Sequence, residues 1–417
     1  MSDNQLLPNP LRMEFWVRPP EAINADLDAL RAAGGITFHS EPPVPDNYPL
    51  ETGPGSWVLI NYADILHVSK NPQIFSSASG ITIQDMPMEF VEYFSSMIAM
   101  DDPRHARLRR LVSAGFTPRM LSRLEDTVQT VARDIVDRII DRDQVDFITD
   151  VAAALPLKIV CDLMGIPESH YEFVFDRTNI ILGAGDPEYV AETDDILMSI
   201  LTAGQDLANL MNEVAEQKRG GDGTDLTSTL INAELENDQL SSSDLASFFI
   251  LLVVAGNETT RNAIGWGLKF LTDNPDQRRL WQNDFEALAP QAVDEIVRLA
   301  SPVTYMRRTT TTETTIGDQP IGEGAKVCMM YLGANRDPSM FERPHDFDIS
   351  RKAQNHVGFG GPGPHYCLGA HLARREITVM FRELFNRVPA IRAIGEPDLL
   401  SSSFIHGIKH LTAAVNG

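Results

Sequence analysis

The chain has 417 residues, and its 58 Asp and Glu against 35 Lys and Arg give a formal charge of −23. This excess of acid disfavours nucleic acids and anionic membrane surfaces as partners, because both are negatively charged. A chain of this length with 43% hydrophobic residues can bury a large core. Its three cysteines, Cys161, Cys328 and Cys367, are far apart, which excludes a disulfide framework or a four-cysteine zinc site and fits a reducing compartment.

The first twenty residues, 1–20, are polar and acidic, so the start of the chain does not have the pattern of a signal peptide. The longest apolar run, residues 248–256, is far shorter than the roughly 20 residues that a membrane-crossing helix needs. We therefore expect a cytoplasmic protein that does not use a membrane.

Helical periodicity dominates the chain, for example over residues 121–140 and 196–215. Strand-like segments are few and short, and they lie at residues 56–61, 314–321 and 326–331. The whole chain, 1–417, is therefore expected to form one domain that is mainly α-helical, with small peripheral β-sheets.

The most clearly marked element is a helix expected over about residues 241–273. Serines and an aspartate at its start offer N-cap oxygens, and Asn274-Pro275 ends it. Its first half is apolar nearly all round and should be buried, yet residues 255–260 read Ala-Gly-Asn-Glu-Thr-Thr. Two interpretations stay open. Either the threonines bond to carbonyls one turn earlier and Glu258 faces water, or Thr259 and Glu258 point into a cavity that Gly256 borders.

Residues 357–369 form a loop that is too rich in glycine and proline for a helix or a regular strand. Within it, Cys367 stands at or just before a helix expected over residues 368–384, where backbone N–H groups stabilise a thiolate. A phosphate-binding loop would end in Gly-Lys-Ser/Thr, and a catalytic thiol would need a paired histidine. A rigid loop that presents one thiolate to a large flat metal cofactor accounts best for the glycines.

Taken together, these motifs resemble those of the cytochrome P450 monooxygenases. The loop with Phe359, His365 and Cys367 is similar to the family's haem-ligand signature, and residues 255–260 are similar to its oxygen-activating helix motif. Residues 295–298 resemble its ExxR element, a structural ion pair. The resemblance implies the cytochrome P450 fold, a single haem-containing domain with haem b as cofactor. One departure is that Phe359 lies one residue further from Cys367 than the common spacing, as in Gly-rich bacterial members that oxidise lipids and sterols.

The resemblance also implies a role for each site residue. Cys367 would bind the haem iron, and Thr259 with Glu258 would relay protons on the opposite face of the haem. The implied activity is insertion of one atom of O2 into a hydrophobic small molecule, such as a terpenoid, a sterol or a lipid. The residues implied to bind the cofactor besides Cys367 are His105, Arg109, Ala255, Gly256, Arg308, Phe359 and His365.

Three other functions stay open: a hydroxylase of aromatic compounds, a peroxide-driven peroxygenase, and a haem-binding sensor or cofactor-free helical module without catalysis. Peroxide brings its own oxygen and protons, so Glu258 and Thr259 disfavour the peroxygenase, and a sensor leaves this buried pair unexplained. Apolar side chains of residues 75–100, 174–201 and 403–408, together with the helix expected at 241–273, are expected to line the substrate pocket. Those candidates are Ile81, Ile83, Met86, Ile180, Leu182, Phe404 and Ile405.

Electrons are expected to come from a separate ferredoxin and ferredoxin reductase, because the chain shows no flavin-binding fingerprint. Two stretches reverse the overall charge. Residues 104–123 hold six arginines and no acid, and residues 349–375 hold only basic charges. A basic face formed by both stretches would dock an acidic ferredoxin, and unspecific surface arginines are the alternative. The basic residues of the second stretch are Arg351, Lys352, Arg374 and Arg375.

Overall fold

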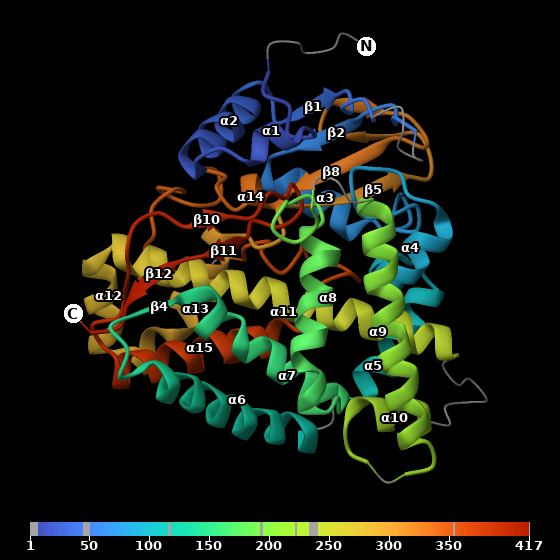
Figure 1. Cartoon of the computed structure of the whole chain (residues 1–417). Helices are drawn as coiled ribbons and strands as arrows, with labels where there is room; N and C mark the ends of the chain where they lie inside the picture. Colours follow the sequence, from blue (N-terminus) through green and yellow to red (C-terminus); the bar gives the residue numbers. More distant parts are fainter. Residues whose placement is uncertain are drawn as a thin grey trace.

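Helices make up most of the protein and small sheets lie to one side of them, as the sequence predicted (Figure 1). None of the described helices has the length and the apolar character that crossing a membrane requires. The computed structural model describes residues 7–44, 51–115, 118–191, 195–221, 223–232, 241–352 and 355–416, and at 114–115 and 118–123 it describes the backbone alone.

The helical part is built around one long central helix, α11, which contacts α7, α9, α13 and α15. The described α-helices are α1 (Met13–Trp16), α2 (Pro20–Ala32), α3 (Tyr62–Lys70), α4 (Met88–Ser95), α5 (Arg104–Gly115), α6 (Pro118–Ile139), α7 (Ala154–Met164), α8 (Tyr171–Gly183), α9 (Ile196–Lys218), α10 (Leu226–Asn232), α11 (Ser242–Asp273), α12 (Pro275–Asn283), α13 (Phe285–Ala300), α14 (Tyr331–Ala334) and α15 (Ala370–Arg387).

The main sheet has the strand order β1-β2-β8-β5-β3, in which β2 and β8 are parallel and the other neighbours are antiparallel. Smaller sheets pair β6 with β7, β10 with β11, and β12 with β4 and β9. The strands are β1 (Ile36–His39), β2 (Ser56–Leu59), β3 (Phe75–Ser76), β4 (Gln144–Asp146), β5 (Tyr305–Thr310), β6 (Thr314–Ile316), β7 (Gln319–Ile321), β8 (Lys326–Met330), β9 (Arg392–Ala393), β10 (Asp398–Leu399), β11 (Ile408–His410) and β12 (Thr412–Ala414).

The helix expected at 241–273 is confirmed as α11, and it crosses the middle of the helical part (Figure 1). Its start is fixed by a capping box, in which the Ser241 side chain accepts from the Asp244 N–H and the Asp244 carboxylate accepts in return. At Gly267 a Cβ would lie 2.8 Å from the Phe381 ring and 3.1 Å from Ile296. This glycine therefore lets α13 and α15 pack directly on α11.

The other predicted elements are present with small differences at their ends. The strand at 56–61 ends at Leu59 because Asn61 precedes α3, and the strand at 326–331 ends at Met330 because Tyr331 begins α14. The helix predicted from residue 368 begins at Ala370. Cys367 therefore belongs to the loop, just before the N-terminus of α15.

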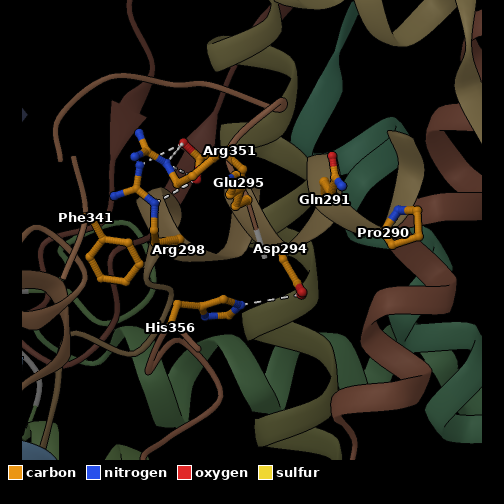
Figure 2. A pocket seen from close by; sticks show the side chains of 9 residues that line it. Pro290, Gln291, Asp294, Glu295, Arg298, Phe341, Arg351 and His356 are labelled. Carbon is orange, nitrogen blue, oxygen red and sulfur yellow. Dashed lines mark hydrogen bonds and ion pairs between the residues drawn. The ribbon is translucent and has the colours of Figure 1, made fainter. Parts of the chain in front are cut away.

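The ExxR residues form a buried ion pair. Arg298 donates to the Glu295 carboxylate at 2.7 and 2.8 Å, and Arg351 donates to it at 3.2 Å (Figure 2). Arg298 also donates to the carbonyls of Asn335 and Pro344, both at 2.7 Å. Because Glu295 and Arg298 are buried, the pair ties α13 to the chain segment that leads into the cysteine loop.

Candidate functional site

A cavity of about 260 Å³ lies between α11 on one side and the cysteine loop with the start of α15 on the other. Nine of the ten predicted site residues line it, and Glu258 is the exception. The sequence analysis placed these residues on four separate segments, and the fold brings those segments together. The nine are His105, Arg109, Ala255, Gly256, Thr259, Arg308, Phe359, His365 and Cys367.

The cysteine loop is shaped by glycines that have specific steric roles. Gly360 has a φ of +84°, and Gly363 has a φ of +154°. A Cβ on Gly363 would lie 2.3 Å from the carbonyl oxygen of Ser69, so the loop packs directly on α3. The Cys367 N–H donates to the carbonyl oxygen of Phe359 at 3.0 Å. These contacts hold the Cys367 side chain at the cavity wall.

The Cys367 side chain is exposed to the cavity, and protein atoms surround it on the other sides. Burial raises the pKa of its thiol, while the N–H of Gly369 and the guanidinium groups of Arg109 and Arg374 act in the opposite direction. A thiolate here therefore needs further positive charge, and a metal ion bound in the cavity would supply it.

One end of the cavity carries four basic side chains, His105, Arg109, Arg308 and His365. The two imidazole rings lie 4.3 Å apart, and Nε2 of the buried His105 has no hydrogen-bond partner among the described residues. Burial and the nearby cations, chiefly Arg308, lower the pKa of His365 to about 3, and burial lowers the pKa of Arg308. Basic groups crowded in this way favour an anionic ligand, and the two propionate groups of haem b meet that requirement.

The face of α11 toward the cavity is formed by Ala255, Gly256 and Thr259. The Thr259 hydroxyl donates to the carbonyl oxygen of Ala255 at 2.8 Å, which is the bond to the preceding turn that one interpretation of the sequence expected. The same side chain lines the cavity, so the two interpretations of Thr259 are compatible.

Glu258 lies where neither interpretation placed it. It does not face water, because its exposure is 1%, and it does not line the cavity. Its carboxylate pairs with Arg261 and accepts from Asn262 at 3.2 Å, and one carboxylate oxygen has no partner among the described residues. Arg261 in turn donates to Asn179 of α8 at 3.0 Å. These contacts turn the acid away from the cavity and toward α8.

Of the four predicted pocket walls, the long helix α11 is confirmed and the other three segments are largely wrong. Of residues 75–100, only Met97 and Ile98 line the cavity, and none of the described residues of 174–201 or 403–408 does. The reason is that several of the predicted side chains pack against one another: Ile81 forms a cluster with Val91 and Ala99, against which Phe404 packs. None of Ile81, Ile83, Met86, Ile180, Leu182, Phe404 and Ile405 lines the cavity.

Sequence reasoning missed Glu376, a buried acid of α15 that lines the cavity. Burial raises its pKa to about 8, so the carboxyl group is mainly protonated at neutral pH. The signal in the sequence is an acid on the apolar face of a helix, one position before Ile377 and close to Met380 and Phe381, which are also buried.

Comparisons with known proteins agree with this geometry. The sequence model of the cytochrome P450 family matches residues 196–388. A methyl-branched lipid omega-hydroxylase of Mycobacterium tuberculosis is 45% identical over 402 residues, which cover 96% of this chain and 92% of that protein. A steroid C26-monooxygenase of Mycolicibacterium smegmatis is 37% identical over 362 residues, 85% of this chain and 82% of that protein. A Mycobacterium marinum cytochrome P450 in complex with pseudoionone has a TM-score of 0.91 at 38% identity, covering 96% of this chain and 97% of that one.

The raised pKa of Glu376 predicts a pH-dependent stability. The unfolded chain releases this proton at the ordinary glutamate pKa, whereas the folded protein holds it up to about pH 8. The free energy of unfolding should therefore fall, relative to Glu376→Gln, as the pH rises from about 5 to about 8, by a few kcal/mol. Urea unfolding of both proteins at several pH values measures this difference.

The control is Glu383→Gln on the same helix, where the side chain is only half-buried and contacts Gln129. The free energy of unfolding of Glu383→Gln should change with pH in the same way as that of the wild type. A constant difference between wild type and Glu376→Gln across this pH range would contradict the prediction.

Proposed function

The chain belongs to the cytochrome P450 family, and from this premise we propose which of its residues carry the activity and on what substrates. It is a haem b-dependent monooxygenase that hydroxylates hydrophobic compounds. The observation that carries the proposed assignment is that Cys367, the four basic side chains and Thr259 line one cavity.

We assign Cys367 as the iron ligand, with Phe359 beside it. The side chains of His105, Arg109, Arg308 and His365 would hold the two propionates, and His105 offers its unpartnered Nε2 for this. Ala255 and Gly256 add no large side chain to the cavity, so α11 can lie close to the face of the haem. When bound, haem supplies the activation of O2 and the insertion of one oxygen atom into a C–H bond.

The reaction consumes two protons and two electrons for each O2, and one oxygen atom leaves as water. We assign the delivery of these protons to the Thr259 hydroxyl and the Glu258 carboxylate. Because Arg261 and Asn262 hold Glu258 away from the cavity, the carboxylate must leave Arg261 to pass a proton toward Thr259. Because Arg261 also donates to Asn179 of α8, this step depends on the position of α8.

A methyl-branched lipid is the substrate class that we propose. The cavity beside Thr259 is walled mainly by apolar side chains, and a relative that is 45% identical carries the name methyl-branched lipid omega-hydroxylase. Hydroxylation of sterols, terpenoids or aromatic compounds is the alternative. The apolar wall includes Met97, Ile98, Phe248, Leu251, Leu252 and Val303.

A cytoplasmic ferredoxin with its reductase is the electron source that we propose. The basic stretch on α5 supports this assignment, although fewer arginines are available than their number in the sequence indicates. Arg104 pairs with Glu92, Arg351 contacts Glu295 and Arg374 pairs with Asp294. The side chains of Arg119 and Arg123 lie outside the described part of the structure.

Replacing the iron ligand tests the function directly. Cys367→Ala should abolish the thiolate-type spectrum of the reduced carbon monoxide complex and reduce hydroxylation below detection, because no other cysteine among the cavity-lining residues can replace it. Cys328→Ala, in the buried strand β8, is the control and should keep both properties. An unaltered spectrum in Cys367→Ala would overturn the assignment.

The proton relay is tested by Thr259→Ala and Glu258→Gln. Both should lower the product formed per electron consumed by on the order of tenfold to hundredfold and raise the release of hydrogen peroxide, because proton delivery to oxygen becomes slow. Thr272→Ala removes the same kind of hydroxyl bond from α11, to Leu268 at 2.8 Å, and should not change this ratio. Full coupling of product to electrons in both site variants would exclude the relay.

The substrate class is tested by titrating the purified enzyme with methyl-branched lipids, steroids and single-ring aromatics while the Soret band is recorded. Branched lipids should bind at least about tenfold more tightly than the aromatics, because each further buried CH2 group contributes about 0.8 kcal/mol. The product should carry its hydroxyl on the terminal carbon of the chain. Tighter binding of aromatics would favour the alternative substrate class.

A further inference from the structure

We propose that Arg374, held by Asp294, is a positioning residue that sets the electrostatic field at Cys367 through the ring of Phe359 and thereby raises the reduction potential of the bound haem. The proposal rests on the assignment of Cys367 as the iron ligand. It concerns a residue outside the cavity wall, on the side of the cysteine loop that faces α13 and α15.

The first step is the contact between Arg374 and Phe359. The guanidinium carbon of Arg374 lies 4.3 Å from the centre of the Phe359 ring, well within the range of a cation–π interaction. Phe359 is in turn hydrogen-bonded to Cys367, because its carbonyl oxygen accepts from the Cys367 N–H at 3.0 Å. Phe359 and Cys367 line the cavity together. The positive charge is therefore one aromatic ring away from the backbone of the iron ligand.

The second step is the way in which Arg374 is held. Its Nε donates to the Asp294 carboxylate at 2.7 Å, and the same carboxylate oxygen lies 3.4 Å from Nε2 of His356. The His356 ring is 5.7 Å from the Phe359 ring, and its Nδ1 accepts from the Gly358 N–H at 3.1 Å. Figure 2 shows His356 pointing toward Asp294. One carboxylate of α13 thus fixes both groups that contact Phe359.

The third step is the electrostatic effect on the sulfur. The Arg374 guanidinium packs on the Phe359 ring, and Phe359 and Cys367 line the cavity together, so the cation is close enough to the proposed iron ligand to act on it through space. Reduction adds one electron to the site, and a nearby cation stabilises that added negative charge. Arg374 should therefore favour the reduced form. Because the Arg374 and Asp294 side chains are 30% and 36% exposed and a small cavity of about 70 Å³ opens beside Asp294 and His356, solvent weakens the effect.

A purely structural role for Arg374 is the competing explanation, and the sign of the effect separates the two. Arg374→Gln should lower the ratio of reduced to oxidised haem at a given potential by about threefold to tenfold. A tenfold change corresponds to 59 mV for a one-electron couple. Asp294→Asn should shift this ratio the opposite way, because Asn can still accept from Arg374 while the compensating negative charge is lost. Arg374→Lys keeps the charge and should retain most of the wild-type potential.

The measurement is a reductive titration of the haem-loaded enzyme followed by absorption, with the carbon monoxide spectrum recorded to establish that the thiolate ligand is intact. The matched control is Arg382→Gln. Arg382 lies on the same helix, pairs with Glu286 at 2.9 Å and covers the Phe285 ring at 5.4 Å, but contacts no residue of the cysteine loop that the structure describes. The haem reduction potential of Arg382→Gln should equal that of the wild type.

The proposal is overturned if Arg374→Gln and Asp294→Asn shift the potential in the same direction, or if neither differs from Arg382→Gln. Should Arg374→Gln fail to bind haem, the question is decided by Asp294→Asn, whose potential should rise, and by Arg374→Lys, whose potential should stay near that of the wild type. Failure of the proposed iron ligand gives a different result, because the thiolate-type spectrum would then be missing from the wild-type enzyme itself.

Discussion

A thiolate at Cys367, the iron ligand that we propose, requires one negative charge to be stabilised at the wall of a mainly apolar cavity, and the contacts around this residue meet that requirement. Burial alone favours the neutral thiol, as the raised pKa of Cys367 shows. The opposing contributions come from backbone N–H groups at the start of α15 and from arginines on α5 and α15. The glycines of the loop allow the backbone to reach this position while it packs against Ser69 of α3. The irregular loop is thus the consequence of placing one sulfur atom among donors that come from different elements.

Glu258 on α11 is a second buried group whose negative charge must be stabilised, and here side chains do so instead of backbone N–H groups. This carboxylate is buried, and it is stabilised by an arginine one turn further along the same helix and by Asn262. One of its oxygens has no partner among the described residues, so the carboxylate is not fully satisfied, as the proposed relay requires. A fully satisfied carboxylate would be more stable but less able to move a proton. The contact of Arg261 with Asn179 adds α8 to this arrangement, so the packing of α8 on α11 and the orientation of the acid depend on each other.

The sequence predicted those features that depend on local chemistry. The bounds of α11 follow from a capping box and from the Asn-Pro that ends it, and the cysteine loop follows from its glycines and prolines. The predictions that failed required knowledge of tertiary partners. The orientation of Glu258 depends on Arg261, which is held by Asn179, a residue far away in the sequence. The docking role of Arg374 stays a prediction, although its contacts with Asp294 and Phe359 could not be read from the sequence. Apolar residues such as Ile81 were assigned to the pocket because composition does not show whether a side chain faces a cavity or another side chain.

Two adjacent acids on α13 connect the stability of the fold with the electrostatics of the site. Figure 2 shows Glu295 pointing to Arg298 and Arg351, and Asp294 pointing to His356. Glu295 thereby fixes the segment that precedes the cysteine loop, whereas Asp294 also pairs with Arg374 of α15. The first pair is deeply buried and so contributes mainly by satisfying groups that would be costly to leave unpaired. The second is partly exposed and contributes little to stability, so its effect is better sought in the field that it produces at Phe359 and Cys367. One turn of α13 therefore holds both the segment that leads into the cysteine loop and Arg374, one of the cations near that loop.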